Sequence, residues 1–253
     1  MTERMIYAAE PGPVAMDLAM NSGSIRITVD PGLKQALVLL KTDDDSGPSA
    51  DAVRNAAVTG NSRRYAVRVP DVGGSFVQGG GSIVVTGSMS NVAIVNGRVF
   101  SNGREITPDD RPGSSAVEAE VSLPAGSTVK LVTLAARTVV TGMLAVMDYE
   151  ASSGSLDAEE IGALDASITS GKITVGTVTE ALDVTLTSGT VSIGQYEGSD
   201  ARLHLTSGVA YMHASPESSG RLSVNMTSGS ATITGAAHLN VKRRVTSGSL
   251  RIT

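Results

Sequence analysis

The tripeptide Thr-Ser-Gly recurs through the second half of the chain, and this repeat constrains the fold more than any other feature. Five copies and one Ser-Ser-Gly variant share a spacing of 17 to 21 residues, and their glycines are Gly154, Gly171, Gly189, Gly208, Gly229 and Gly248. A catalytic serine would occur once and not in every copy. We therefore interpret the tripeptide as structural, with glycine present because it tolerates a positive φ where a strand turns.

Apolar residues occupy equivalent positions on both sides of each glycine. Three residues before the successive glycines stand Ala151, Ile168, Leu186, Leu205, Met226 and Val245. Two residues after them stand Leu156, Ile173, Val191, Ala210, Ala231 and Leu250. Polar residues fill the positions between, so that apolar and polar side chains alternate with a period of two. Each repeat is therefore predicted to contain two short strands joined at Ser-Gly.

A unit of this length cannot bury its apolar face alone, so the copies are expected to stack. Pairing each strand with the equivalent strand of the next repeat gives a continuous core. The predicted fold is thus all-β, a β-solenoid or β-helix-like stack with an irregular β-rich N-terminal region. Antiparallel hairpins packed as a sandwich are the alternative. The near-constant period and the constant character of the columns favour the solenoid.

The N-terminal half contains two further copies of the unit, one around Gly23 and a weaker one around Gly81. Alternating segments at 35–41 and 65–69 indicate strands. The segment 49–57 is the one plausible helix, with Ser49 as its expected N-cap.

A charged and proline-containing stretch, Thr107–Ser115, has the composition of a linker. We therefore predict two parts of the chain. The first, 1–115, is a β-rich region with one short helix, and the second, 116–253, is the repeat array.

The pattern resembles the bacterial DUF4097 family, the "putative adhesin" β-strand-repeat proteins. The resemblance rests on Leu123-Pro124-Ala125-Gly126 leading into the Thr-Ser-Gly units, and on the early segment Asn21-Ser22-Gly23-Ser24-Ile25. It implies a β-solenoid-like repeat with no established catalytic residues, and it implies an adhesin-like role.

Composition narrows the classes of function. A net charge of −5 and a pI of about 5.2 argue against a nucleic-acid partner, which usually requires a basic face. The absence of cysteine excludes disulfides, thiolate metal sites and a cysteine nucleophile. No paired-histidine, nucleophile-elbow or phosphate-loop motif is present, so we expect no enzyme activity, no cofactor and no metal.

No targeting signal is visible in the sequence. The first residues include Glu3, Glu10, Pro11 and Pro13, which do not fit a secretory signal peptide. The apolar runs are far shorter than the ~20 residues that a transmembrane helix needs. A soluble cytoplasmic protein is expected, with export that leaves no N-terminal signal as the open alternative.

One outward column, six residues before the glycines, contains Asp148, Asp165 and Asp183, followed by Arg202. A stacked row of carboxylates could hold a hard cation or hydrolyse a glycoside. A solvated polar column flanked by arginine is the simpler interpretation, and we favour it.

Basic residues gather in the last repeat, at Lys242, Arg243, Arg244 and Arg251, whereas the early repeats are acidic. Arg243 occupies a column that is apolar in the other repeats. An arginine in this column is tolerable only if the last repeat, which forms the final rung of the stack, is open to solvent or contacts a partner. We expect these residues to form an assembly surface for an acidic patch, such as the early rungs or the loop Asp43–Asp45.

These observations favour a non-enzymatic scaffold or self-association module that assembles through its C-terminal rung. Its partner is either a second copy of the chain, in a homo-oligomer or filament, or another protein. The alternative is an adhesin-like or carbohydrate-binding surface protein. A polysaccharide-active enzyme that uses the aspartate column is a third, less favoured hypothesis.

Overall fold

The computed structural model describes residues 1–61, 63–71 and 115–253, together with the strand segments 76–79, 82–85, 92–95, 98–101 and 104–106. The predicted repeat copy around Gly81 is not part of the repeat array, because its segments 76–79 and 82–85 pair antiparallel with each other in a two-stranded sheet of their own. Residues 80–81 of that copy and residues 107–114 of the predicted linker lie outside the described residues.

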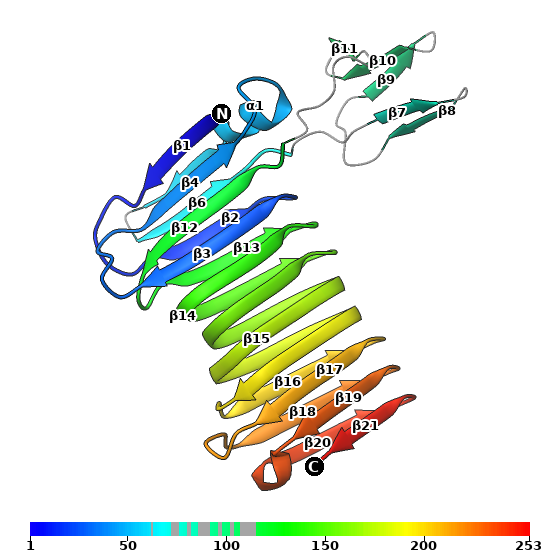
Figure 1. The fold of residues 1–253 in the computed structure, drawn as a ribbon. Coiled ribbons are helices and arrows are strands. Elements are labelled where there is room, and N and C mark those ends of the chain that lie inside the picture. Colours follow the sequence, from blue (N-terminus) through cyan, green and yellow to red (C-terminus); the bar gives the residue numbers. More distant parts are fainter. Residues whose placement is uncertain are drawn as a thin grey trace.

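The described elements are almost all strands (Figure 1). Those before residue 115 are β1 (Thr2–Tyr7), β2 (Ala15–Ala19), β3 (Ser24–Asp30), β4 (Leu37–Thr42), α1 (Pro48–Arg54), β5 (Ala57–Gly60), β6 (Arg64–Arg68), β7 (Phe76–Gly79), β8 (Ser82–Val85), β9 (Val92–Val95), β10 (Arg98–Ser101) and β11 (Arg104–Ile106). Those after it are β12 (Glu118–Pro124), β13 (Thr128–Thr133), β14 (Arg137–Ala151), β15 (Ser155–Tyr196), β16 (Asp200–Leu205), β17 (Val209–Ala214), β18 (Arg221–Met226), β19 (Ser230–Thr234), the 3₁₀ turn η1 (Ala236–His238), β20 (Asn240–Val245) and β21 (Ser249–Ile252). The prediction of an all-β class is confirmed.

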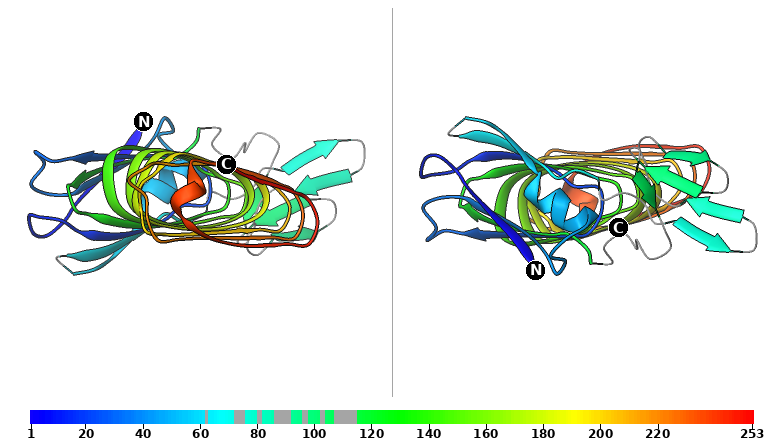
Figure 2. Two further views of the ribbon diagram at one scale, coloured as in Figure 1. Left: turned by 90° about the horizontal axis from the view of Figure 1, so that it is seen from below. Right: turned by 90° about the horizontal axis from the view of Figure 1, so that it is seen from above.

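One 16-stranded sheet curls back on itself, so that two layers face each other across the core (Figure 2). The first layer follows the order β5-β6-β2-β13-β14-β15-β16-β18-β20. The second follows the order β1-β4-β12-β3-β14-β15-β17-β19-β21. The long strands β14 and β15 belong to both layers because they bend from one into the other.

Equivalent residues of the later repeats pair with one another in parallel. In the first layer Leu186 pairs with Leu205, which pairs with Met226. In the second layer Val191 pairs with Ala210, which pairs with Ala231. Because a shift of one residue would exchange the two faces of a strand, this register keeps every apolar column on the inner side.

The turns at Thr-Ser-Gly also lie directly on one another. The N–H of Ser228 donates to the carbonyl of Thr206 at 2.8 Å. Gly229 has φ +110°, and a Cβ there would lie 2.2 Å from the carbonyl oxygen of Gly208. Both the positive φ and the close backbone contact therefore require glycine at this position.

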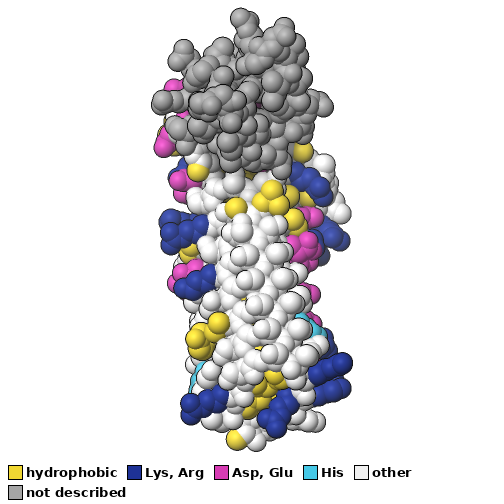
Figure 3. Space-filling model, turned by 90° about the vertical axis from the view of Figure 1, so that its right-hand side faces the viewer, with side chains coloured by type: hydrophobic (Ala, Val, Ile, Leu, Met, Phe, Trp, Pro, Cys, Tyr) yellow, Lys and Arg dark blue, Asp and Glu magenta, His cyan; other side chains and the backbone are white. Residues whose placement is uncertain are grey.

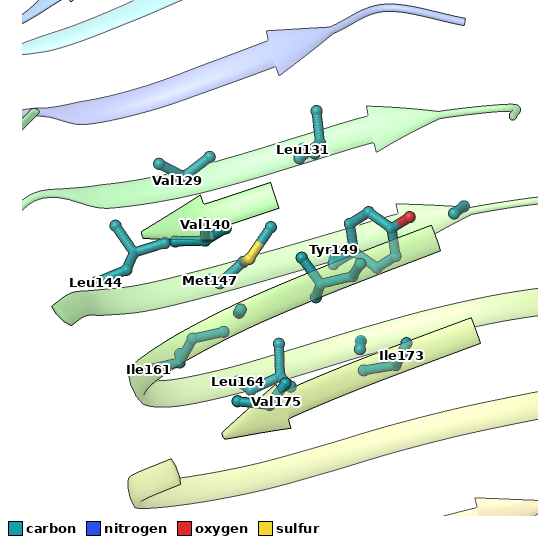
Figure 4. Packing of buried hydrophobic residues seen from close by; sticks show 14 of the residues in the cluster. Val129, Leu131, Val140, Leu144, Met147, Tyr149, Ile161, Leu164, Ile173 and Val175 are labelled. Atoms are coloured by element: carbon teal, nitrogen blue, oxygen red, sulfur yellow. The ribbon is translucent and has the colours of Figure 1, made fainter. Parts of the chain in front are cut away.

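The predicted core columns are buried. Ile168, Leu186 and Leu205 are at most 2% exposed, and so are Ile173 and Val191 on the facing layer. Figure 4 shows side chains of this kind, from Val129 to Val175, between the strands. The period-two alternation thus predicted the inner face correctly.

The unit around Gly23 belongs to the same sheet as the later repeats. Its strands β2 and β3 pair in parallel with β13 and β14. A feature that the sequence analysis did not predict is that β12 lies between β3 and β4, parallel to the first and antiparallel to the second. Strands from both sides of residue 115 therefore share one sheet, and the two-part division of the chain stays a prediction.

The predicted helix exists, but both of its ends were predicted wrongly, since it ends at Arg54 and Ala57 begins β5. Helix α1 spans Pro48–Arg54 and its N-cap is Gly47, not Ser49. The Ser49 hydroxyl instead donates to the carbonyl of Ser115 at 2.9 Å, so this side chain anchors the helix to the start of the repeat region. Helix α1 lies over the N-terminal end of the two layers (Figure 2), and four of its residues are buried.

Replacement of a single stacked leucine tests this core. We expect Leu186→Ala to lower the free energy of unfolding by ~2–5 kcal/mol, because it leaves a cavity between two fully occupied rungs. The exposed neighbour Thr187 is the matched control, and Thr187→Ala should change the free energy of unfolding by less than ~0.5 kcal/mol. Chemical denaturation measures both, and equal effects of the two substitutions would contradict the assignment of Leu186 to the core.

Candidate functional site

Five charged side chains form a row across the outer face of the first layer. Strand register places Lys130 beside Asp148, and Asp148 beside Asp165. At the other end of the row, Asp183 pairs with Arg202. The three aspartates that the sequence singled out are therefore brought onto one face between Lys130 and Arg202, and Asp17 on β2 lies on the other side of Lys130.

Each terminal aspartate of this row has a basic partner. Lys130 Nζ lies 2.8 Å from Asp148 Oδ2 and 2.5 Å from Glu150 Oε1. These hydrogen bonds raise the pKa of the Lys130 ammonium above its ordinary value. At the other end, Arg202 Nη1 lies 3.3 Å from Asp183 Oδ2, and its Nη2 lies 2.5 Å from Asp200 Oδ2.

The central carboxylate, Asp165, makes no ion pair with any residue that the structure describes. Partial burial raises the pKa of Asp165 above its usual range, and the neighbouring charges of Asp183 and Asp148 raise it further. The row is thus balanced at its ends and carries an excess of negative charge in the middle.

An open cavity of about 470 Å³ lies beside the N-terminal half of this row. Its lining residues are Val132, Thr133, Leu134, Asp148, Glu150, Ala151, Ser152, Asp165 and Ser167. Across the described part of the chain, no cluster of three or more His, Asp or Glu side chains has the arrangement of a metal site. Lys130 and Arg202 together engage two of the three aspartates, which favours a structural charge ladder over a reactive site.

The basic residues of the last repeat occupy both layers. The set consists of Lys242, Arg243 and Arg244 on β20, with Arg251 on β21. All four side chains are exposed. Arg243 pairs with Val224, which is 1% exposed, so an arginine stands where the preceding rung has a buried valine.

Among the described strands, β20 pairs with β18 alone and β21 pairs with β19 alone. Val245 on β20 is 38% exposed, whereas its counterpart in the preceding rung, Met226, is fully buried. Lys and Arg side chains are visible at this end of the molecule in Figure 3, on both sides of an uncharged stripe. The last rung therefore combines positive charge with incompletely covered apolar side chains.

The sequence analysis missed Lys130 as a member of the charged row. Its strand precedes Leu134-Ala135 and not Ser-Gly, so it was not aligned with the repeats. The alternation of Val129, Leu131 and Thr133 is the signal that could have aligned it, because these residues match the inward columns of the later strands.

No family model matches the chain, and no curated protein matches its sequence, so membership of DUF4097 is not confirmed. Similar solved structures include a "putative adhesin" from Parabacteroides distasonis, with 13% identity and a TM-score of 0.47, covering 100% of this chain and 96% of that one. Another, from Bacteroides fragilis, has 8% identity and a TM-score of 0.48, with coverage of 100% and 97%. Both of these proteins are named "putative adhesins".

None of the helices in the described residues is long and apolar enough to cross a membrane.

The unbalanced position of Asp165 predicts a stabilising substitution. A raised pKa in the folded state means that the charged carboxylate costs stability at neutral pH, and that this cost disappears below the unfolded pKa of about 3.9. We expect Asp165→Asn to raise the free energy of unfolding at pH 7 by no more than ~0.5 kcal/mol, because the site is largely exposed. The gain should vanish at about pH 3, where the carboxyl is protonated in both states.

Asp148→Asn is the matched control, since it removes a carboxylate that Lys130 already engages. Denaturation at both pH values should show no gain for this variant. An equal gain for both variants would show that the partners along the row do not matter.

Proposed function

We propose that this chain is a non-enzymatic β-solenoid scaffold whose C-terminal rung, formed by β20 and β21, binds an acidic surface of a second copy. The observation that carries the proposal is Arg243, an exposed arginine in a column that is otherwise buried and apolar.

The parallel pairing of equivalent residues supports the scaffold part of the proposal. Leu186, Leu205 and Met226 follow one another in register, and so do Val191, Ala210 and Ala231 on the other layer. A rod built in this way presents regular outer faces and two different ends. The engagement of Asp148 and Asp183 by basic partners supports a non-enzymatic role for the aspartate column.

Arg243 supports the docking part. An arginine covered by a further apolar rung would be buried without a counter-ion, which is strongly unfavourable. A carboxylate of a partner satisfies the guanidinium, and the surface that carries this carboxylate also covers the apolar side chain of Val245. The same rung thus supplies charge for recognition and apolar surface for stability.

The acidic partner surface is best sought in the early rungs. Asp157 is exposed and Glu160 is half-buried on β15. The loop Asp43–Asp45 is less suitable, because Asp44 accepts a hydrogen bond from Ser115 and Asp45 pairs with the N-terminal amine. A contact between unlike surfaces propagates, so this association would build chains of copies.

An adhesin-like role, which the resemblance implies, is compatible with this proposal. A rod that binds through one end could hold a partner at a distance from the surface that carries the rod.

Charge reversal tests the docking rung. We expect the protein to form assemblies in low salt that become smaller as salt screens the charges, and we expect Arg243→Glu/Arg244→Glu to lose this salt-dependent association. Sedimentation velocity at several protein and salt concentrations measures it. Arg63→Glu/Arg64→Glu is the matched control, because it reverses two adjacent exposed arginines on and beside β6.

Absence of any association that added salt weakens, or equal loss of it in both double variants, would contradict docking by the C-terminal rung. Circular dichroism of both variants should be unchanged, since none of the four arginines is buried.

A further inference from the structure

Strand β1 forms the edge of the second layer at the N-terminal end (Figure 1). Among the described residues it pairs with β4 alone, in antiparallel register from Thr2 opposite Thr42 to Tyr7 opposite Leu37. An edge strand presents a row of N–H and C=O groups that another strand can pair with.

The outer face of this edge is apolar. Met5 is 56% exposed and Tyr7 is 60% exposed. Their cross-strand neighbours on β4 are Leu39 and Leu37, both of which are half-buried. Edge strands of soluble proteins usually carry charges or proline where these residues lie. The only charged residues of β1 are Glu3 and Arg4, which have opposite signs.

Backbone geometry assigns the groups that face outward along the edge. The N–H of Ala8 donates to the carbonyl of Ala36 at 2.9 Å. Because hydrogen-bonding direction alternates along an antiparallel strand, the even-numbered residues of β1 bond to β4. The N–H and C=O groups of Glu3, Met5 and Tyr7 therefore point to the unpaired side.

We propose that β1 pairs in antiparallel fashion with β1 of a second copy, around a two-fold axis at Met5. In this register Met5 lies opposite Met5 of the second copy, and Glu3 lies opposite Tyr7. Each of these pairs exchanges both backbone hydrogen bonds, because its N–H and C=O groups already face the edge. The interaction is independent of the docking rung at the other end of the molecule.

Side-chain direction and charge argue against two neighbouring registers. A register shifted by one residue would place the apolar face of one copy beside the inner face of the other. A shift by two residues toward the N-terminus would place Arg4 opposite Arg4, and like charges directly opposite are unfavourable. Pairing at Met5 instead sets Arg4 opposite Ile6 and uses the whole strand.

Pairing of two identical surfaces is more favourable at this edge than at the C-terminal rung. Two identical C-terminal rungs would bring together Lys242, Arg243 and Arg244 from each copy, and these charges repel. Two identical β1 edges bring together Met5, Tyr7 and Leu39 from each copy, and these apolar side chains form one continuous patch across the axis. Isologous contacts of this kind close as dimers.

The first test is the oligomeric state. We expect a dimer that persists in high salt, because apolar contacts and backbone hydrogen bonds hold it. Met5→Lys places two ammonium groups opposite each other on the axis, so it should weaken dimerisation at least tenfold. Met143→Lys is the matched control, since Met143 is 49% exposed on β14, away from the edge. Sedimentation equilibrium measures all three proteins.

A monomer at every concentration would overturn the proposal, and so would a Met5→Lys variant that dimerises as well as Met143→Lys. The variant Arg243→Glu/Arg244→Glu should retain the salt-resistant dimer. The two proposals can therefore fail separately.

The second test examines the register, using the absence of cysteine from the chain. Directly opposite residues of a hydrogen-bonded pair have Cα atoms about 5.5 Å apart, which suits a disulfide. Met5→Cys should therefore form a cross-linked dimer on oxidation. Glu3→Cys should cross-link efficiently only when mixed with Tyr7→Cys. Efficient cross-linking of Glu3→Cys alone, without cross-linking of Met5→Cys, would exclude the proposed register.

Discussion

Close contact between the backbones of successive turns is the constraint on which the array depends. A Cβ on Gly248 would lie 2.3 Å from the carbonyl oxygen of Gly229, and a Cβ on Gly229 would meet Gly208 in the same way. Glycine therefore allows each turn to lie directly on the preceding one. The hydrogen bonds between turns then bring residues at equivalent positions into register along both layers.

This register makes each column homogeneous, with opposite consequences for apolar and charged residues. Apolar columns are stabilised by this arrangement, because a residue such as Leu186 packs between other buried aliphatic side chains. A column of carboxylates is destabilised by repulsion between like charges, because Asp165 is flanked by two further aspartates. Lys130 and Arg202 limit this penalty at the ends of the row. Two edge strands of the sheet also differ, since β20 carries several like charges whereas β1 is apolar on its outer face and nearly neutral.

Period-two alternation made the strands, the buried columns and the outward aspartates predictable, because it assigns each residue of a strand to a face. Lys130 could not be found from the tripeptide, since its strand precedes Leu134. The position of β12 between β3 and β4 depends on contacts between distant segments, and no local pattern indicates it. Ser49 has the residue type of an N-cap, but its hydroxyl bonds to Ser115 instead.

Deletion of one repeat tests the stacking of equivalent positions most directly. Removal of residues 209–229 joins Gly208 to Ser230 and brings together rungs that have the same register. Removal of residues 209–219 deletes β17 alone and connects β16 directly to β18, two neighbouring strands of the same layer, so the second layer loses one rung. The account predicts that the full-repeat deletion unfolds cooperatively on heating, and that the half-repeat deletion does not. Circular dichroism as a function of temperature measures both. Loss of cooperative unfolding in the full-repeat deletion, with the half-repeat deletion folded, would contradict it.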